Sequence, residues 1–413
     1  MLQGKVTVPP SKSIAQRAII MALLSNGKSE IRNIGKSDDV MAAISLLRDL
    51  GGKAEYEDNI VRIKGGLRPD VHFLNVKESG LSLRIATVLS AVTGKNFVIT
   101  GEGTLMRRPV SMLEQALYQG GVICQTNGGF LPISFHGKLR SGNYLIDASV
   151  TSQIVTGLLI ALPYLKGDSV LFVRNLSSKP YVDVTLNMLR KFGVKIKHYE
   201  YERFIIPGNQ KYKSVKYTVE GDWSSAAFWF VAGAIAGDLT ISGLDAQSLQ
   251  GDRVIVDALK AAGVETTFDG TDFRVRKSKI APFTFDAADC PDLIPVLTLL
   301  AACAEGTSTI FGAERLRFKE SNRGVVLKEE FGKLNITVDI QGDMLTVEGG
   351  RIGGGTVDVH HDHRIAMTFA LAALVSEEKI EIDDAECVSK SYPEFFEDLE
   401  SLKNAREPDA VCE

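Results

Sequence analysis

The sequence repeats one pattern of helices and strands six times, with a period of about 70 residues. In each copy an apolar helix precedes a short strand, and in the first five copies a glycine lies between them: Gly27, Gly94, Gly167, Gly237 and Gly306. Successive glycines are 67, 73, 70 and 69 residues apart. Because glycine readily adopts the left-handed conformation that ends many helices, we expect each of the five to be a C-cap. So constant an interval restricts the chain to a fold built from repeats.

A second, amphipathic helix follows in the same phase and also ends before a strand. The residues predicted to end it in five copies are Gly52, Gly121, Gly193, Gly263 and Asn335, at intervals of 69, 72, 70 and 72 residues. Asparagine commonly replaces glycine where φ is positive, so the fifth copy fits the series. Two interleaved series with one period predict a unit of helix, strand, helix and then short strands.

Six units predict two domains of three. The fourth unit begins near residues 219–222, so we expect one domain over residues 10–220 and the other over residues 1–9 plus 221–413. The sixth copy of the second helix ends the chain without its final strands, and a strand expected at residues 3–8 is predicted to complete that unit from the other terminus. The first helices are apolar nearly all round, which predicts that they lie buried at the centre of each domain of an α/β (α+β) fold.

The predicted starts of the first helices carry side chains suited to binding anions and hydroxyl groups. If the three units of a domain are related by pseudo-rotation, their positive helix ends face one way, and we expect all six ends to meet across one cleft. Ser11 or Ser13 is expected to cap the first of these helices. The candidates at the first three helix starts are Lys12, Ser13, Arg17, Arg84, Thr151, Ser152 and Gln153.

The other three helix starts carry acids. Most acids at such positions are caps, which is what we expect of Asp222, Asp289 and Asp362. Asp292 differs, because Pro291 already begins the helix and places this carboxylate inside the first turn, as a candidate acid–base group. Further cations lie near helix starts at one phase of the repeat: Arg107, Arg108, Lys179, Lys319, Arg323 and Lys390.

Composition excludes several classes of protein. A net charge of -4 disfavours general nucleic-acid binding. No apolar run reaches the roughly 18 residues of a membrane span and no leader segment is recognisable, so we expect a cytoplasmic protein without membrane contact.

The stretch from His360 to His363 lacks the spacing of known metal motifs, and no P-loop or G-x-S-x-G elbow occurs, so neither a metal nor a cofactor is predicted. The widely spaced cysteines, predicted to be free thiols, are Cys124, Cys290, Cys303, Cys387 and Cys412.

Eleven short motifs in order along the whole chain resemble the 5-enolpyruvylshikimate-3-phosphate synthase (3-phosphoshikimate 1-carboxyvinyltransferase) family. They are PSKS with Arg17, SGLSLR, RRP, TSQ, SSKPYVDVT, EGDWSSAAF, QGDR, PDLIP, FKESNR, DHRIAM and KSYP. The resemblance implies an inside-out α/β barrel of two domains, each with three βαβαββ repeats around buried parallel helices. It also implies transfer of the enolpyruvyl group of phosphoenolpyruvate to the 5-hydroxyl of shikimate-3-phosphate.

The family's binding residues map onto positions of this sequence. For shikimate-3-phosphate, the resemblance implies Lys12, Ser13, Arg17, Thr151, Ser152, Gln153, Ser178, Tyr181, Asp292 and Lys319. For phosphoenolpyruvate, it implies Lys12, Gly80, Arg108, Gln153, Arg323, Arg364 and Lys390. Both substrates are polyanions and repel one another. We therefore expect cations and positive helix ends to converge where the two substrates bind.

Three residues are the candidates for the chemistry that the resemblance implies. Asp292 is the candidate base for the 5-hydroxyl, Glu320 the candidate partner for the methyl proton, and Lys12 the group that assists departure of phosphate. This scheme requires no cofactor. We expect the protein to be a monomer. One stretch departs from the family pattern: where many members read NAGTAMRP, residues 78–85 read ESGLSLRI, in which Gly80 and Arg84 are kept.

Two alternatives stay open. The sister family, UDP-N-acetylglucosamine 1-carboxyvinyltransferase, has the same fold but carries a Lys-Asn pair at the first motif and a reactive cysteine in a mobile loop. This chain has Ser-Lys-Ser there, and Cys124 falls in a strand context. The other alternative is a non-catalytic protein that binds phosphorylated ligands, which would need the anion contacts but not Asp292 and Glu320 together.

Overall fold

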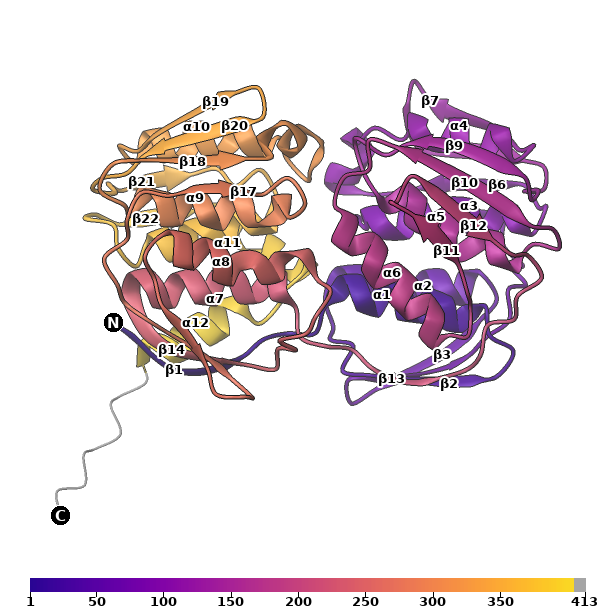
Figure 1. Cartoon of the computed structure of the whole chain (residues 1–413), viewed down its shortest axis with the longest axis horizontal. Coiled ribbons are helices and arrows are strands. Elements are labelled where there is room, and N and C mark those ends of the chain that lie inside the picture. The colour runs from indigo at the N-terminus through magenta and orange to yellow at the C-terminus, as the bar shows by residue number, and fades with distance from the viewer. Residues whose placement is uncertain (405–413) are drawn as a thin grey trace, which may run out of the picture. The chain divides into compact units, whose positions relative to one another are not determined.

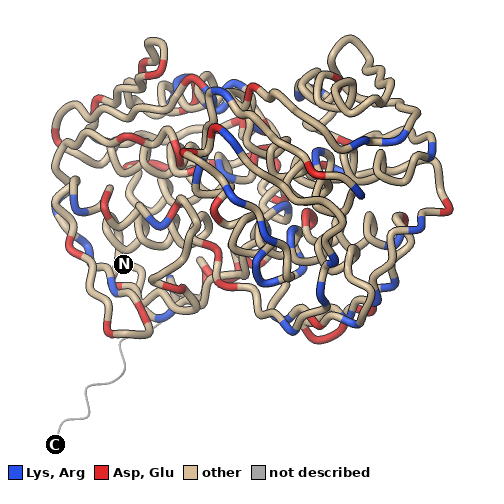
Figure 2. The backbone as a smooth tube through the Cα atoms, turned by 45° about the vertical axis from the view of Figure 1, so that its right-hand side comes forward, with Lys and Arg blue, Asp and Glu red and all other residues tan. Residues whose placement is uncertain are grey.

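The computed structural model describes residues 1–404, which form two compact units (Figure 1). One unit is Pro10–Val219, and the other joins Met1–Pro9 to the described residues from Glu220 onwards. Lys, Arg, Asp and Glu are interspersed along the backbone of each unit (Figure 2), so a charged site has to be assembled locally. Among the described residues, no helix is both long enough and apolar enough to cross a membrane. Cys412, predicted to be a free thiol, lies outside the described residues, whereas the other four cysteines are free.

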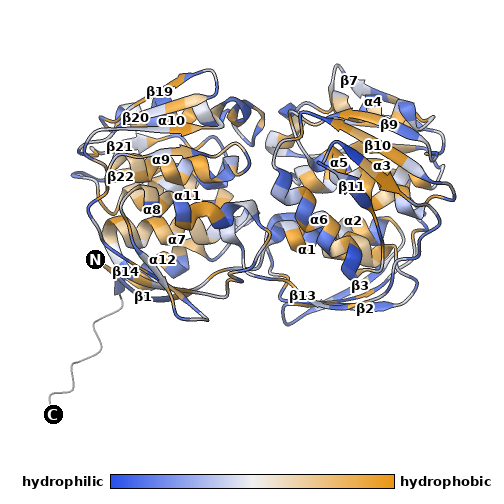
Figure 3. Ribbon diagram, viewed as in Figure 1, coloured by the Kyte–Doolittle hydropathy of each residue, from blue (hydrophilic) through white to orange (hydrophobic). Residues whose placement is uncertain are grey.

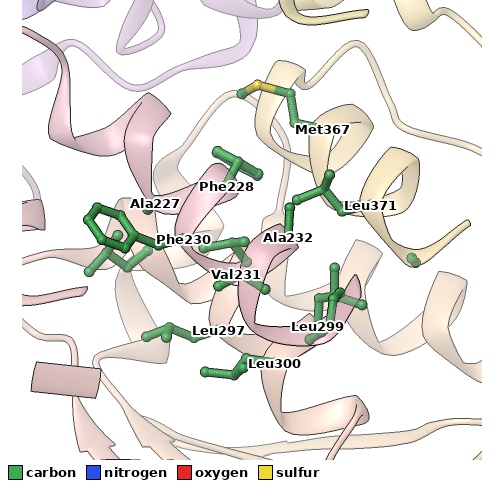
Figure 4. Packing of buried hydrophobic residues seen from close by; sticks show 14 of the residues in the cluster. Ala227, Phe228, Phe230, Val231, Ala232, Leu297, Leu299, Leu300, Met367 and Leu371 are labelled. Atoms are coloured by element: carbon green, nitrogen blue, oxygen red, sulfur yellow. The ribbon is translucent and has the colours of Figure 1, made fainter. Parts of the chain in front are cut away.

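The first helices of the repeats form the core of each unit, as their composition predicts. Every residue of α3 and of α7 is buried, and the ribbon of these helices is largely apolar (Figure 3). In the second unit α7, α9 and α11 pack on one another (Figure 4). Burial of each large aliphatic side chain contributes about 1.5–3 kcal/mol. The six helices are α1 (Lys12–Leu23), α3 (Gly80–Val92), α5 (Gln153–Ala161), α7 (Trp223–Ala236), α9 (Ile294–Ala302) and α11 (His363–Ala372).

The second helices are amphipathic and cover the sheets. They are α2 (Asp38–Asp49), α4 (Ser111–Gln119), α6 (Lys179–Lys191), α8 (Ile255–Ala261), α10 (Arg323–Lys333) and α12 (Phe395–Asn404). Short 3₁₀ turns precede four of them: η1 (Gly103–Arg107), η3 (Gly251–Val254), η5 (Ala313–Phe318) and η6 (Ala385–Lys390). Two more adjoin first helices: η2 (Leu162–Tyr164) and η4 (Pro291–Leu293).

There is one small sheet for each repeat. In five of them a parallel pair is extended by two antiparallel strands, whereas among the described residues the sixth consists of a parallel pair alone. In the unit of residues 10–219 the orders are β13 (Lys216–Thr218), β2 (Lys28–Arg32), β4 (Ile60–Lys64), β3 (Lys53–Glu57); β5 (Phe73–Asn75), β6 (Phe97–Thr100), β8 (Phe130–His136), β7 (Ile123–Asn127); and β9 (Asn143–Asp147), β10 (Ser169–Arg174), β12 (Arg203–Ile206), β11 (Lys197–Tyr199). In the other unit they are β1 (Leu2–Thr7), β14 (Gly237–Ser242), β16 (Phe273–Arg276), β15 (Thr266–Phe268); β17 (Thr284–Asp286), β18 (Thr307–Phe311), β20 (Met344–Glu348), β19 (Thr337–Gln341); and β21 (Gly355–Val357) with β22 (Ile380–Ile382).

The N-terminal strand does not complete the sixth repeat, so that prediction was wrong. β1 pairs in parallel with β14, from Leu2 opposite Gly237 to Thr7 opposite Ser242. The reason is an exchange of strands between repeats: β13, which precedes α7 in the chain, pairs instead with β2 of the first repeat. The place beside β14 is therefore left for β1. The chain passes between the two units twice, at Pro9–Pro10 and at Val219–Glu220.

The first glycine series is a C-cap series only in part. Gly94 follows the C-cap of α3 with φ of 76°, in the predicted conformation. Gly306 has φ of 128° but lies beyond the end of α9, whose C-cap is Cys303. Gly237 is the C-cap of α7, but its φ is -156°, and Gly27 and Gly167 also lack a positive φ, so the left-handed conformation predicted for these three was wrong. At each of these three positions an atom of a neighbouring segment lies where a Cβ would be. A Cβ on Gly27 would lie 2.6 Å from Ser214 Oγ, and one on Gly237 would lie 2.6 Å from the Leu2 carbonyl oxygen. Ser141 Oγ fills the same space beside Gly167.

The second series is left-handed as predicted, with one correction in the first repeat. Gly121, Gly193, Gly263 and Asn335 have φ of 77°, 83°, 78° and 65°. In the first repeat Gly51, with φ of 96°, takes this position instead of Gly52. Gly52 packs against Leu23 and Leu47, whose nearest carbons would lie 2.8 Å from an added Cβ.

Candidate functional site

In the unit of residues 10–219, the N-terminal turns of three buried helices meet. Gln16 Oε1 of α1 accepts hydrogen bonds from Ser79 Oγ (2.7 Å) and Ser82 Oγ (3.1 Å) at the start of α3. Gly157 brings α5 against α3 so closely that a Cβ there would lie 2.9 Å from the Arg84 carbonyl oxygen. The positive ends of three helix dipoles therefore gather at one end of this unit, as expected for an anion site.

Lys12 is the first residue of α1, and its ammonium group is held by a carboxylate that the sequence did not single out. Lys12 Nζ lies 2.8 Å from Asp39 Oδ2, with both side chains largely buried. Asp39 stands in the first turn of α2, where an acid is favourable in any helix, so its position alone gave no functional signal. Ser11 occupies the capping position of α1, but its hydroxyl makes no capping hydrogen bond, and that prediction was wrong.

Arg17 is buried one turn further along α1, and its hydrogen-bond acceptors are neutral. Its Nε donates to Thr185 Oγ1 at 2.9 Å and its Nη1 to the Ser13 carbonyl at 2.8 Å. The guanidinium carbon lies 6.0 Å from the centre of the Tyr181 ring. Burial lowers the pKa of Arg17 to about 10, and the Tyr181 hydroxyl opposes this shift. A desolvated cation with neutral partners is favourable for an incoming anion.

Two more guanidinium groups lie at the start of α3. A Cβ on Gly80 would lie 2.8 Å from Arg108 Nη1 and 3.1 Å from Arg84 Nη1. Arg84 donates to the carbonyl groups of Gly80 (3.1 Å) and Pro109 (3.3 Å). Glu78, where the family pattern differs, anchors η1 just before Arg108: its Oε2 accepts from Thr104 Oγ1 at 2.9 Å. The structure thus brings the predicted residues Gly80 and Arg108 together.

The remaining candidates of this unit lie at the starts of α5 and α6. Thr151 Oγ1 accepts from the Gln153 backbone N–H at 3.2 Å, while Ser152 is buried and makes no capping hydrogen bond. Gln153 Oε1 is buried without a hydrogen-bond partner. Ser178, also buried, has φ of 53°, an uncommon backbone conformation for a serine that tends to occur at functional sites.

The other unit is organised around Arg323, the first residue of α10, whose side chain is inaccessible to solvent. Its Nη1 donates to Asp292 (2.7 Å), its Nη2 to Glu320 (2.7 Å) and its Nε to Asp362 (2.8 Å). Burial by itself lowers the pKa of Arg323, but the three carboxylates raise it above its ordinary value. One buried cation therefore fixes the positions of both candidate proton-transfer groups, Asp292 and Glu320.

Asp292 lies in η4, immediately before α9, as the position of Pro291 predicted. Besides Arg323, Lys319 Nζ lies 2.9 Å from its Oδ1 and Arg364 Nη2 lies 3.3 Å from its Oδ2. Burial alone would raise the pKa of Asp292, but Arg364, Lys319 and Arg323 together hold it well below its ordinary value. The carboxylate is thus ionised and surrounded by cations.

The predicted capping role of two acids is confirmed. Asp222 accepts from the Ser225 N–H (2.9 Å) at the start of α7, and Asp362 accepts from the Arg364 N–H (3.0 Å) at the start of α11. Asp362 also binds Arg323, a second role that only the structure shows. Asp289 does not cap, since Cys290 precedes η4.

Asp252 of η3 is a buried acid to which the sequence assigned no role. Its Oδ2 accepts from the Ser224 hydroxyl, and its Oδ1 is buried without a partner. Burial and the nearby charge of Asp292 raise the pKa of Asp252 to about 7, opposed by Arg364. The QGDR motif contains Asp252, but its burial could not be read from the motif.

Three predicted cations hold equivalent places in different repeats. Arg108 follows η1, Lys319 follows η5, and Lys390 ends η6, each just before a second helix. Lys390 is buried, and η6 packs against α11, the helix that carries Arg364. The common phase seen in the sequence is therefore a common structural position within the repeat.

The three histidines around the start of α11 differ in burial, since His360 and His361 are exposed and His363 is buried. His361 Nδ1 is 2.6 Å from Asp384 Oδ2 on the surface, while His363 is buried. Within the described residues, one group has ligand atoms close enough to share an ion, namely Glu329, Glu330 and His360. Glu330 is already bound by Lys333 Nζ, at 2.7 and 2.8 Å.

Comparison with known proteins gives one consistent result. The sequence model of the family described as EPSP synthase (3-phosphoshikimate 1-carboxyvinyltransferase) matches residues 1–399. A 3-phosphoshikimate 1-carboxyvinyltransferase of Clostridium kluyveri is 43% identical over 97% of this chain and 95% of its own length. An EPSP synthase structure from Acinetobacter baumannii superposes with a TM-score of 0.80 at 27% identity, covering 97% of this chain and 96% of that one. The enolpyruvyl transferase NikO from Streptomyces tendae shares the fold. It superposes with a TM-score of 0.76 at 19% identity, covering 97% of this chain and 95% of that one.

Proposed function

The chain belongs to the EPSP synthase family, the 3-phosphoshikimate 1-carboxyvinyltransferases, and from this premise we propose how its residues perform the reaction. The enzyme transfers the carboxyvinyl group of phosphoenolpyruvate to the 5-hydroxyl of shikimate-3-phosphate and releases phosphate. The fold, an inside-out α/β barrel with three repeats in each unit, is that of the matched structures. The observation that carries the residue assignment is the placement of Asp292 among Lys319, Arg323 and Arg364.

Shikimate-3-phosphate is proposed to bind through the helix starts of residues 10–219. Arg17, buried with neutral partners, and the N-terminal turns of α1, α5 and α6 supply the positive potential and hydrogen-bond donors for its phosphate. The unpartnered Gln153 Oε1 is available to a substrate hydroxyl. The groups assigned to this substrate are Lys12, Ser13, Arg17, Thr151, Ser152, Gln153, Ser178, Tyr181, Asp292 and Lys319.

Phosphoenolpyruvate is proposed to bind through the guanidinium and ammonium groups. Arginine binds carboxylate and phosphate in a bidentate manner, and Gly80 leaves the space that the Arg108 guanidinium fills. The groups assigned to this substrate are Lys12, Gly80, Arg108, Gln153, Arg323, Arg364 and Lys390.

The chemistry proceeds by addition and elimination. Asp292 accepts the proton of the 5-hydroxyl as that oxygen bonds to C2 of phosphoenolpyruvate, while C3 gains a proton from Glu320. The C2–O bond to phosphate then breaks as Lys12 donates a proton to the leaving oxygen, and C3 returns a proton to Glu320 to give the carboxyvinyl ether. The proton that Asp292 took from the 5-hydroxyl restores Lys12. These steps balance without a cofactor.

The ion pairs around Asp292 suggest why it becomes basic only when substrate is present. Alone, it is a weak base, because three cations hold its pKa well below the ordinary value. Two of these cations, Arg323 and Arg364, are assigned to phosphoenolpyruvate, whose negative charge would offset theirs and raise the pKa of Asp292. Asp292 therefore becomes a stronger base when phosphoenolpyruvate binds.

Release of inorganic phosphate tests the function directly. Purified protein is mixed with phosphoenolpyruvate and either shikimate-3-phosphate or UDP-N-acetylglucosamine. We expect release with the first acceptor alone. Release with UDP-N-acetylglucosamine would favour the sister activity, and no release with either would favour a non-catalytic protein that binds phosphorylated ligands. The names of the matched relatives do not favour these alternatives.

The enzyme is further proposed to act as a cytoplasmic monomer without nucleic-acid or membrane partners. Every group assigned to the two substrates comes from one chain, and the four described cysteines are free, which suits a reducing compartment. Sedimentation at assay concentration tests the oligomeric state, and a dimer whose dissociation abolishes turnover would contradict the proposal.

A further inference from the structure

An open concavity of about 490 Å³ lies on the exposed face of the sheet β13–β2–β4–β3. Its lining is strongly basic, with Lys28, Lys53, Lys64, Arg62 and Lys216 against two glutamates. This volume lies within the roughly 300–1,000 Å³ of small-molecule sites. Ile63 is the one apolar residue of the lining, so the concavity suits a charged ligand without an aromatic group.

The strand register places three lysines side by side. Lys28 of β2 is directly opposite Lys64 of β4, and Lys64 is directly opposite Lys53 of β3. All three side chains are exposed. Neighbouring strands are about 4.8 Å apart, so the row of three spans roughly 10 Å. Like charges directly opposite one another destabilise a sheet, and this row contains two such pairs.

The next row on the same face shows the opposite pattern. Lys216, Glu30, Arg62 and Glu55 face one another in that order across the four strands, with alternating charge. Glu30 is engaged by Arg32 (2.6 Å) and Arg62 (3.7 Å), and the hydrogen bond from Arg32 is the main cause that lowers its pKa. Within residues 1–404, no ion pair or side-chain hydrogen bond involves Lys28, Lys53 or Lys64. The lysine row is therefore an uncompensated charge beside a row whose charges alternate.

The row is distant from Lys12, the proposed catalytic group of the same unit. Lys12 begins α1, whereas Lys28 follows the other end of this helix of 12 residues. At 1.5 Å per residue, α1 alone separates the two positions by about 18 Å. A ligand on the lysine row would be held by residues with no role in either substrate site.

We propose that the row Lys28–Lys64–Lys53 binds a linear inorganic polyphosphate. Such an anion carries several negative charges along a length comparable with the row, so it can lie across three ammonium groups at once and remove their mutual repulsion. A single phosphate reaches only part of the row. A nucleoside triphosphate shares the chemistry of the phosphate chain, but the lining offers no aromatic ring for its base.

Calorimetric titration with tripolyphosphate tests the proposal. The titration is repeated with each substrate alone at saturation, so that each substrate site is occupied in turn without turnover. We expect one saturable site, weakened at least tenfold in Lys64→Gln, which removes the central charge. Lys216→Gln is the matched control, because it removes a charge from the same concavity but from the row of alternating charge, and we expect less than a threefold change there. Orthophosphate should bind at least tenfold more weakly, and adenosine triphosphate no more tightly than tripolyphosphate.

Stability and turnover provide independent measurements. At low salt Lys64→Gln should melt at a higher temperature than the unsubstituted protein, because repulsion is relieved, and tripolyphosphate should no longer raise its melting temperature. Turnover should be unchanged in both variants, so failure of this proposal is separate from failure of the proposed function. Absence of saturable binding, equal weakening in both variants, displacement by the substrates, or tighter binding of an acidic peptide would each overturn the proposal.

Discussion

Replacement of Gly80 by alanine tests whether the start of α3 is part of the phosphoenolpyruvate site. The new Cβ would lie 2.8 Å from Arg108 Nη1 and 3.1 Å from Arg84 Nη1. Arg84 is held by two carbonyl groups, so the Arg108 guanidinium, at the end of a flexible side chain, has to shift by several tenths of an ångström. That shift weakens whatever Arg108 holds and changes little else.

The size of the effect follows from one charged contact. A hydrogen bond to a charged group contributes about 1.5–3 kcal/mol. Since about 1.4 kcal/mol is a factor of ten, the KM for phosphoenolpyruvate should rise by roughly ten- to a hundredfold. The KM for shikimate-3-phosphate should change less than threefold. The melting temperature should stay the same or rise, because alanine is more favourable than glycine in a helix by about 0.5–1 kcal/mol.

Steady-state kinetics with each substrate varied in turn, together with thermal unfolding, measure these quantities. Gly332→Ala is the matched control: Gly332 also lies in a helix, and an added Cβ there meets no atom within 4 Å. Its KM values should be unchanged. An unaltered KM for phosphoenolpyruvate in Gly80→Ala would refute the placement of Arg108 in that site, and an equal rise of both KM values would show a general distortion.

Four further predictions concern the buried acids and the thiols. Asp292→Ala should fold, bind shikimate-3-phosphate within tenfold of normal by calorimetry and lose about 10²–10⁴ in kcat as expected for an acid–base group; near-normal turnover would exclude it as the base. Asp362→Asn removes one of the three negative charges around the buried Arg323, so denaturant unfolding should show a loss of about 3–5 kcal/mol, and a loss below about 1 kcal/mol would contradict the importance of this pair. Because the pKa of Asp252 is raised to about 7 in the folded protein, the folded state keeps a proton there that the unfolded chain has already released. The stability that this group contributes is therefore present at low pH and is lost as pH rises from about 4 to 7. Relative to Asp252→Asn, the unsubstituted protein should therefore lose up to about 1.4 kcal/mol per pH unit in that window, and parallel stability curves would refute the buried proton. Burial raises the pKa of Cys124 to about 12, with Glu114 adding to the shift, so iodoacetamide at neutral pH should leave activity intact, whereas rapid inactivation would indicate a reactive cysteine like that of the sister family.

The sequence predicted those parts of the site whose signals are local. A carboxylate that caps a helix binds an N–H two or three residues away, so Asp222 and Asp362 could be recognised as caps from their neighbours. Pro291 fixes where a helix begins, and it therefore placed Asp292 inside the first turn. The ion pairs could not be predicted in this way. Asp39 is 27 residues from Lys12 and meets it because the two helices of one repeat pack together. Asp362 is 39 residues from Arg323 and meets it because two successive repeats pack together.

The amino-acid sequence by itself determined the sixfold repeat, the buried first helices and the fold class, because apolar periodicity and helix-ending residues act over a few positions. The tertiary structure decided which strand pairs with which. β1 and β13 each leave the repeat that follows them in the chain and join a sheet elsewhere. It also decided that Gly27, Gly167 and Gly237 lie close against neighbouring segments and do not adopt the left-handed conformation. Strand pairing and close approach depend on segments far apart in sequence, which no local pattern records.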